Sequence, residues 1–343
     1  MKTLILLLCC ALSLSLSPFF LWAGQVEASV VLEPPDLNRG DRYRLIFVTS
    51  GLTQAVSPDI AYYNDFVDGY GDAVLPSDWR ALASTLEVNA RDNTGTTGSG
   101  GVPLYRLDGV RVANDYADLW DASLMNPVRY SELGTTVAEK VWTGTNMDGT
   151  TPSKRYLGTL LPAGNEQARV GNSTGTPGGW VQWGYDPLTD YRHVYAISGV
   201  LSIPLEMEVT RATAWRNASK PGRVRYEGVV SGLNFSTGLT FTATDGSTLY
   251  QSGSVSAGEC ETTKSGRVRC VYRDPLVKKK FVQASFRPTG AAGEYRYKVF
   301  MNKLDVPASQ AEPLGLVIDD GTNLYEGSAA NCTDKIKKLV CLD

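Results

Sequence analysis

Few residues of this chain have the types and spacing that catalysis requires. The string Gly171-Asn172-Ser173-Thr174-Gly175 fits the G-x-S-x-G pattern of a serine nucleophile, and His193 is the single histidine among 343 residues. Such a nucleophile stands on a turn between a strand and a helix. Here Thr176-Pro177-Gly178-Gly179 follows, and proline and glycine at these positions disfavour a helix. We therefore favour a glycine-rich loop over a secreted hydrolase, and expect His193 to be structural.

A second group of side chains has the chemistry of a calcium site. Asn146 and Asp148 lie in an Asn-x-Asp-Gly turn, and carboxylate and amide oxygens are the ligands that Ca²⁺ prefers. The same turn is also explained by side-chain caps and local hydrogen bonds, which is the commoner arrangement. We keep Asn146 and Asp148 as the candidate metal ligands and expect no other cofactor. Four further acids are near enough in sequence to contribute: Asp108, Asp115, Asp118 and Asp121.

A third group could bind a ligand by stacking. Trp180, Trp183 and Tyr185 follow a glycine-rich loop that contains Asn172. Exposed aromatic rings of this kind form a surface for a sugar ring or a protein. The alternative is that the rings fill the core beside the closing strands of the domain. We take these four residues as the candidate ligand-binding set.

A basic patch is the last candidate. Lys278-Lys279-Lys280 lies close in sequence to Arg267, Arg269 and Arg273. Such a patch attracts polyanionic glycans or anionic lipid. Runs of like charge are more often solvated loops, and we favour that interpretation from sequence alone.

The beginning of the chain predicts export. Lys2 precedes an apolar segment, Leu4–Leu16, and small residues stand before a cleavage point after Ala28. This is the pattern of a signal peptide over residues 1–28. The apolar segment continues to Trp22, so an uncleaved anchor is an alternative, and lipidation of Cys9 or Cys10 is another. We expect a secreted, periplasmic or cell-surface protein with no transmembrane domain once the signal is removed.

The remaining cysteines support that compartment. Cys260, Cys270, Cys332 and Cys341 are even in number, and an exported chain forms disulfides. Their spacings of C-x9-C and C-x8-C are too wide for the zinc-binding C-x2-C pattern. We predict the bonds Cys260–Cys270 and Cys332–Cys341, each closing a hairpin.

Charge divides the chain near Pro204. Residues 29–204 hold 13 basic and 20 acidic side chains, a net of −7, whereas residues 205–343 hold 19 and 15, a net of +4. Such a shift coincides with a domain boundary. Neither part is basic enough to predict nucleic-acid binding.

The first part reads as a mixture of strands and short helices. Ser57-Pro58-Asp59 predicts a helix start with Ser57 as the cap, and a second short helix is predicted over Ser77–Ala83. Val141-Trp142-Thr143 reads as a strand whose indole fills the core, before a tight turn. Strands or hairpins are also predicted at Tyr43–Thr49, Val102–Ala113, Gly179–Trp183 and His193–Leu201. The helix that starts at Ser57-Pro58-Asp59 would bury five residues at helical spacing: Ile60, Tyr63, Phe66, Val67 and Tyr70.

The order of these parts resembles the C-type-lectin-like fold over about residues 39–204, and more closely endostatin and bacterial endostatin-like surface domains. The resemblance is carried by Asp78-Trp79-Arg80-Ala81-Leu82, Val102–Gly109, Ala117-Asp118-Leu119-Trp120, Val141–Gly149 and Val170-Gly171-Asn172-Ser173. It implies a recognition domain for protein or glycan ligands. The framework cysteines, the calcium-dependent sugar motifs and the zinc-binding histidines of these families are absent from this sequence. Neither calcium-dependent sugar binding nor zinc is therefore carried over.

The second part, residues 205–343, contains an internal repeat of about 50 residues. Gly222–Tyr226 matches Gly293–Tyr297, and Leu239–Tyr250 matches Leu314–Tyr325. Each copy alternates apolar and polar residues, has an Asp-Gly turn and then ends in its own cysteine pair. We predict one antiparallel β-sandwich made from both copies, because neither copy alone could bury an apolar face.

Together these features predict an α+β, C-type-lectin-like domain over residues 29–204 followed by an all-β sandwich. We expect a non-enzymatic binding or adhesion protein that recognises an extracellular protein or glycan. The alternatives are a structural envelope or matrix component with no small ligand and, third, a secreted hydrolase.

Overall fold

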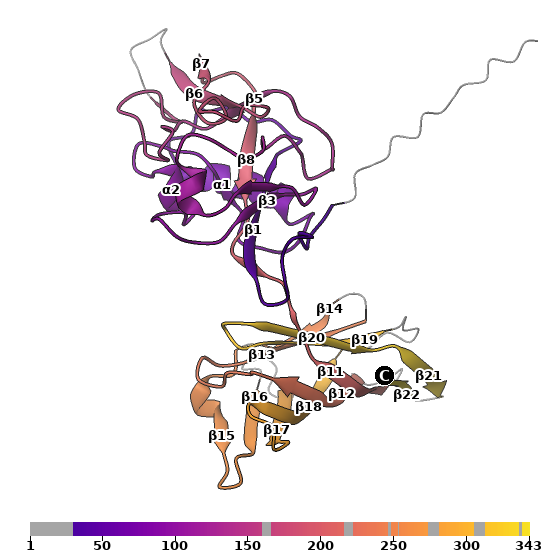
Figure 1. Cartoon of the computed structure of the whole chain (residues 1–343). Coiled ribbons are helices and arrows are strands. Elements are labelled where there is room, and N and C mark those ends of the chain that lie inside the picture. The colour runs from indigo at the N-terminus through magenta and orange to yellow at the C-terminus, as the bar shows by residue number, and fades with distance from the viewer. Residues whose placement is uncertain are drawn as a thin grey trace, which may run out of the picture.

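The computed structural model describes residues 30–159, 166–215, 222–245, 248–252, 254–273, 281–304, 313–335 and 338–343. The predicted signal peptide and Lys278-Lys279-Lys280 lie outside these ranges. Two parts follow one another along the chain and join through a narrow segment near residue 204 (Figure 1). Each part has its own sheets and its own buried core.

The N-terminal domain is built on one mixed sheet. Its strands are β1 (Arg42–Val48), β2 (Arg80–Ala81), β3 (Leu104–Arg106), β4 (Arg111–Ala113), β5 (Lys140–Trp142), β6 (Gln167–Asn172), β7 (Gly184–Pro187), β8 (His193–Ile197) and β9 (Leu201–Ser202). The main order is β4-β3-β1-β8-β5-β6-β7, with β2 on β8 and β9 on β1. The first strand, β1, therefore pairs with β8 near the end of the domain, with Phe47 opposite Ala196.

The helices are few and short. α1 (Ile60–Gly71), α2 (Ala90–Asn93) and α3 (Tyr116–Leu119) lie between the first strands. α1 buries Tyr63 and Val67 against the sheet, as its spacing predicted, whereas Ile60, Phe66 and Tyr70 are only partly buried there. Its cap is Asp59, whose side chain accepts a hydrogen bond from the Ala61 amide, so the prediction of Ser57 as the cap was wrong. The Ser57 hydroxyl instead bonds to the Asp59 backbone.

Apolar residues fill both faces of this sheet. One cluster contains Trp142, Phe47 and Trp79, and the other contains Trp180, Tyr195 and Ile46. Trp142 is fully buried and its indole nitrogen donates to the Thr53 carbonyl oxygen at 3.0 Å, which confirms its prediction as an interior anchor.

Two predicted elements of this domain were wrong. The segment Ser77–Ala83 is no helix: its central residues form β2, and Trp79 and Leu82 enter different clusters instead of sharing a face. Pairing with β8 is the reason, since successive side chains of a strand point to opposite faces. Gly179–Trp183 is likewise not a strand, and the edge strand β7 begins only at Gly184.

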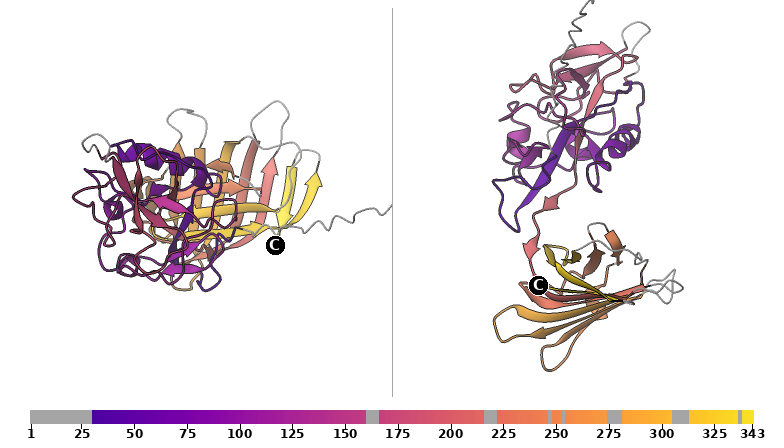
Figure 2. Two further views of the ribbon diagram at one scale, coloured as in Figure 1. Left: turned by 90° about the horizontal axis from the view of Figure 1, so that it is seen from above. Right: turned by 90° about the vertical axis from the view of Figure 1, so that its right-hand side faces the viewer.

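The C-terminal domain consists of two facing sheets around one core (Figure 2). The five-stranded sheet has the order β10-β20-β19-β13-β14, and the eight-stranded sheet has the order β15-β16-β17-β18-β12-β11-β22-β21. Every pairing is antiparallel except that of β10 with β20. The strands are β10 (Leu205–Glu206), β11 (Glu208–Trp215), β12 (Gly222–Ser231), β13 (Thr240–Thr244), β14 (Thr248–Gln251), β15 (Cys260–Thr262), β16 (Val268–Arg273), β17 (Phe281–Pro288), β18 (Glu294–Leu304), β19 (Leu314–Asp319), β20 (Leu324–Ala329), β21 (Asn331–Lys335) and β22 (Lys338–Leu342).

The two sequence copies occupy matching places in these sheets. β12 pairs with its counterpart β18, and β13 pairs with its counterpart β19. Glu227 and Lys298 hold the same position in the two copies and are opposite one another, as are Thr242 and Val317. An approximate two-fold axis therefore passes through the middle of both sheets.

The copies also exchange hairpins. The hairpin β15–β16 that ends the first copy pairs with β17, the first strand of the second copy, whereas β21–β22 pairs with β11 of the first. Each copy thus completes the sheet of the other, and neither is a self-contained unit.

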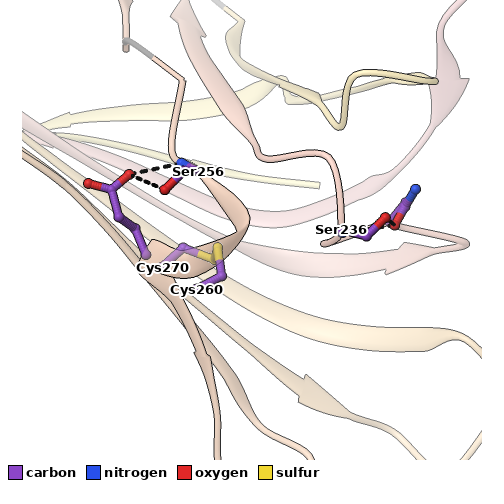
Figure 3. Close-up of a disulfide and its surroundings, with 6 residues drawn as sticks. Ser236, Ser256, Cys260 and Cys270 are labelled. Carbon is purple, nitrogen blue, oxygen red and sulfur yellow. Dashed lines mark hydrogen bonds between the residues drawn. A yellow bond between two sulfur atoms is a disulfide. The ribbon is translucent and has the colours of Figure 1, made fainter.

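Both predicted disulfides are confirmed. Cys260–Cys270 joins β15 to β16, and Cys332–Cys341 joins β21 to β22. Figure 3 shows the first bond below the short helix η1 (Ala257–Glu259), where the Glu259 carboxylate accepts from the backbone and hydroxyl of Ser256. Among the described residues, no helix has the length and apolar character that crossing a membrane requires.

Candidate functional site

The candidate site lies at the β7 edge of the N-terminal sheet. Arg169 on β6 is directly opposite Tyr185 on β7, so both side chains share one face of the sheet. Trp183 comes two residues before Tyr185, and alternation along an extended chain places it on that face as well. Trp183 is 62% exposed and Tyr185 is 44% exposed. Two aromatic rings therefore stand on the solvent side of a sheet edge.

The predicted ligand-binding set is divided by the structure. Trp180 is fully buried, with its ring centroid 5.8 Å from that of Trp120 and 5.9 Å from that of Tyr195. It belongs to the core, so its prediction as a surface residue was wrong. The Tyr195 hydroxyl donates to the Trp180 carbonyl oxygen at 2.9 Å. The buried Trp180 thus anchors one end of the loop, and the exposed Trp183 lies at its other end.

Asn172 has a local role in the same loop. Its side-chain oxygen accepts hydrogen bonds from the Thr174 amide at 3.0 Å and the Thr174 hydroxyl at 2.8 Å. This is an Asx turn, which fixes the start of the loop. Asn172 is half-buried.

Two glycines allow the side chains of Trp183 and Met147 to lie close to the backbone. A Cβ on Gly179 would stand 2.9 Å from Cε3 of Trp183, and one on Gly178 would stand 2.9 Å from Sδ of Met147. Both distances are closer than carbon side chains normally approach. Met147 is itself exposed. We call Met147, Trp183 and Tyr185 the aromatic face. A residue larger than glycine at position 178 or 179 would displace the side chain of Met147 or Trp183.

Two arginine side chains contact the residues of this face and the loops that carry them. The guanidinium of Arg155 lies over the Tyr185 ring and donates to the Gln167 side-chain oxygen at 2.6 Å. Arg169 donates to the Gln182 side-chain oxygen at 2.9 Å and also to the side chain of Asn146. These bonds tie the loop that carries Met147 to the loop that carries Trp183.

Two residues with strained, left-handed backbone conformations lie next to segments of this face. Ala122 and Arg155 are the non-glycine residues with left-handed φ angles, of 75° and 71°, among the described residues. The Ala122 carbonyl oxygen accepts from the Gly178 amide, and the Arg155 carbonyl oxygen accepts from the Arg169 amide at 2.8 Å. Strain of this kind persists only where the surroundings hold it, and it is often found at binding sites.

An ion-paired carboxylate fixes the edge strand behind the aromatic face. Asp186 is buried and accepts from Lys140 at 2.7 Å and from Arg192 at 2.8 Å. Burial raises the pKa of Asp186, but hydrogen bonds from Lys140 and Arg192, together with their charges, outweigh it and hold the pKa below its usual range. Because Asp186 alternates with Tyr185 along β7, fixing one residue orients the other.

The candidate calcium ligands have other partners. Asp148 accepts from the Thr150 amide at 3.0 Å and the Thr150 hydroxyl at 2.6 Å, and the Asn146 oxygen accepts from Arg169. Burial raises the pKa of Asp148, but the bonds from Thr150 and the charge of Arg91 outweigh it and lower the pKa overall. Among the described residues, no three His, Cys, Asp or Glu side chains gather as a metal site. The side-chain oxygens of Asn146 and Asp148 therefore already accept hydrogen bonds from protein groups.

The Gly171–Gly175 string places Ser173 where a nucleophile could not act. Its hydroxyl is fully buried, donates to the Val137 carbonyl oxygen at 2.7 Å and accepts from the Glu139 amide at 3.0 Å. His193 Nδ1 lies 2.6 Å from the Thr49 carbonyl oxygen, which requires that nitrogen to carry a proton. Ser173 follows β6 and precedes turns instead of a helix. The Ser173 and His193 side chains thus both form hydrogen bonds to backbone carbonyl groups of other segments.

Sequence reasoning missed Met147, Arg155, Arg169 and Gln182 as members of this site. Arg169 becomes a neighbour of Tyr185 only through the register of β6 and β7, and Arg155 reaches Tyr185 from an irregular segment. Nothing in their spacing along the sequence indicates either contact. No protein-family model matches the chain, and no curated protein matches it significantly.

Proposed function

We propose that this chain is an exported, non-enzymatic binding or adhesion protein. Its N-terminal domain would recognise a glycan or protein ligand through the aromatic face of Met147, Trp183 and Tyr185. We further propose that this domain belongs to the C-type-lectin-like class and most resembles endostatin. The pairing of β1 with β8, which brings the two ends of the domain together, supports that assignment.

The observation that carries the proposal is the exposure of Trp183 on a braced backbone. A tryptophan ring left 62% exposed costs hydrophobic stability that burial would have gained. The Trp183 ring lies close to Gly179 and, with the neighbouring Tyr185, suits stacking against the C–H face of a sugar ring. Arg155 and Gln182 border the rings with polar groups that can bond to hydroxyls.

A protein ligand is the second candidate, and the position of β7 favours it. β7 stands at the end of the order of the described strands, and an edge strand can pair with an added strand. Trp183 and Tyr185 would then supply the side-chain contacts. Both candidates use the same face and differ in whether the ligand has an extended peptide backbone.

The disulfides of the C-terminal domain support export. Two such bonds are typical of proteins outside the cytosol. We propose a secreted, periplasmic or cell-surface location, reached through the predicted signal over residues 1–28. We also propose that recognition needs no calcium, because the Asn146 and Asp148 oxygens already accept hydrogen bonds.

A glycan and matrix-protein array probed with the full chain tests this function. The proposal predicts saturable binding that survives EDTA. The double variant Trp183→Ala/Tyr185→Ala should weaken it by about tenfold or more, the loss typical of removing stacking anchors. Tyr191→Ala is the matched control, since Tyr191 is an exposed aromatic of the same domain outside this face. A chain that binds nothing on the array would favour a structural envelope component instead.

A further inference from the structure

The outer face of the eight-stranded sheet carries two adjoining basic grooves. Their volumes are about 370 Å³ and about 440 Å³, and they share Arg267, Ser285 and Lys298. The neighbouring residues on these strands, such as Val268 and Val299, point into the core. Alternation along the strands therefore turns the cations outward. The remaining polar or charged lining residues are Arg225, Arg269, Gln283, Arg287, Thr289 and Arg296.

The strand register places these cations in rows. Arg287 on β17 is directly opposite Arg296 on β18, and Arg267 precedes the residue of β16 that pairs with Phe286 of β17. Three guanidinium groups thus line up across three adjacent strands, whose spacing is about 4.8 Å. In the next row, Ser285 lies between Arg269 and Lys298.

Acidic partners neutralise only one side of this face. Glu227 forms ion pairs with Arg225 and, at 3.6 Å, with Lys298. Glu261 is opposite Arg269 in the register, yet the ion pairs of the described residues include neither of them. Like charges directly opposite one another destabilise a sheet. The basic face therefore retains uncompensated positive charge.

Arg267 shows the effect of this crowding. Its Nε is buried and has no hydrogen-bond partner among the described residues. Desolvation, followed by the charges of Arg269 and Arg287, lowers the pKa of the Arg267 guanidinium. An anion placed in the groove would relieve both the unpaired nitrogen and the repulsion.

The approximate two-fold symmetry shows that the fold does not require a cation at every one of these places. Lys298 in one half of the sheet corresponds to Glu227 in the other. Aligning Cys270 with Cys341 makes Val340 the counterpart of Arg269, and Val340 is buried. The same topology thus forms with an acidic or an apolar residue at two of these places, whereas Arg296 keeps a basic counterpart in Arg225.

We propose that this face binds a linear polyanionic polysaccharide, with sulfate or carboxylate groups seated on the row Arg267, Arg287 and Arg296. Guanidinium groups pair with such anions through two parallel hydrogen bonds. Ser285 and Gln283 would bond to sugar hydroxyls. A single nucleic-acid strand fits less well, because it needs aromatic platforms for its bases. The lining aromatic among the described residues is Phe300, whose ring packs beside Phe281.

Titration of the full chain with four probes tests the proposal. The probes are a heparin oligosaccharide, a polyuronate oligosaccharide of equal length, oligo-dT, and phosphatidylglycerol vesicles, each across a series of salt concentrations. We expect the tightest binding to one of the two polysaccharides, and which of them wins distinguishes sulfate from carboxylate. Tighter binding of oligo-dT or vesicles, or no binding of either polysaccharide at low salt, would overturn it.

A pair of charge-matched variants tests the site. Arg287→Gln/Arg296→Gln should weaken polysaccharide binding by about tenfold or more and flatten its salt dependence. Without ligand, this variant should melt no lower than the wild type, because two opposed charges are removed. Arg211→Gln/Lys335→Gln removes the same charge from exposed positions in the other half of the sheet. Equal losses in the two variants would contradict a site on this face. Trp183→Ala should leave the binding unchanged, so this result is independent of the proposed function.

Discussion

The guanidinium group of Arg155 lies over the ring of Tyr185, with its central carbon 3.8 Å from the ring centroid. Arg155 makes this contact from a left-handed backbone conformation, with φ at 71°. An arginine there costs about 1–2 kcal/mol relative to a relaxed backbone. A strained residue that braces an exposed ring indicates that the ring's orientation matters more than local stability.

Arg155→Gly should separate these two effects. Glycine tolerates the left-handed backbone, whereas the variant loses a cation–π contact of about 0.5–1 kcal/mol and the hydrogen bond to Gln167. We expect the free energy of unfolding to change by less than about 1 kcal/mol, while ligand affinity falls severalfold. Urea denaturation and ligand titration measure the two quantities. A variant that binds like the wild type would show that Tyr185 needs no brace.

Trp142→Ala should destabilise the N-terminal domain severely. The indole is fully buried and its nitrogen donates to Thr53, so removal leaves a cavity and deletes one of the two hydrogen bonds that the Thr53 carbonyl oxygen accepts. A loss of about 3–5 kcal/mol is expected. Trp183→Ala, which removes an equal volume from the surface, should cost less than about 1 kcal/mol. Thermal denaturation followed by tryptophan fluorescence compares them, and similar losses would refute the assignment of Trp142 as the interior anchor.

Gly144→Ala and Gly69→Ala should act in opposite directions. Gly144 has a φ of +58°, and a Cβ there would lie 2.6 Å from the Ser84 carbonyl oxygen and 2.7 Å from the Leu157 amide. Because neither backbone group can move freely, we expect a loss of about 2 kcal/mol or more. Gly69 lies within α1, with nothing near its missing Cβ. Alanine there should stabilise by about 0.5–1 kcal/mol. Differential scanning calorimetry decides both signs.

Asp186→Asn should remove a pH-dependent part of the stability. The folded pKa of Asp186 lies below its usual range, whereas in the unfolded chain it is about 3.9. The ionised carboxylate therefore contributes stability above about pH 4, and this contribution is lost as the pH falls towards the lower folded value. The wild type should melt higher than Asp186→Asn at pH 7, and the gap should close in acid. A gap of constant size would show that the ion pairs with Lys140 and Arg192 do not contribute.

Local patterns in the sequence predicted local structure well. Asp108-Gly109 sets the hairpin of β3 and β4, with Gly109 at a φ of +78°. The two cysteine pairs each close the hairpin that contains them. Each of these features depends on residues within about ten positions, so a single sequence carries enough information to specify it.

Features that depend on tertiary neighbours escaped prediction. Ser77–Ala83 has helix-compatible residues, yet pairing with β8 draws Arg80 and Ala81 into the sheet. Trp180 and Trp183 are three positions apart in one glycine-rich loop, and only the fold decides that one is buried and the other exposed. The basic face likewise appears only when the register brings Arg287 opposite Arg296. Composition cannot supply that register.

The most direct test of the aromatic face is fluorine NMR of the protein labelled with 5-fluorotryptophan. Trp183→Phe assigns the resonance of Trp183, and the strongest ligand from the array is then added in steps. We predict a saturable shift of the Trp183 resonance, with the buried Trp142 resonance unmoved. A ligand that binds and leaves the Trp183 resonance unchanged would show that binding takes place outside the aromatic face.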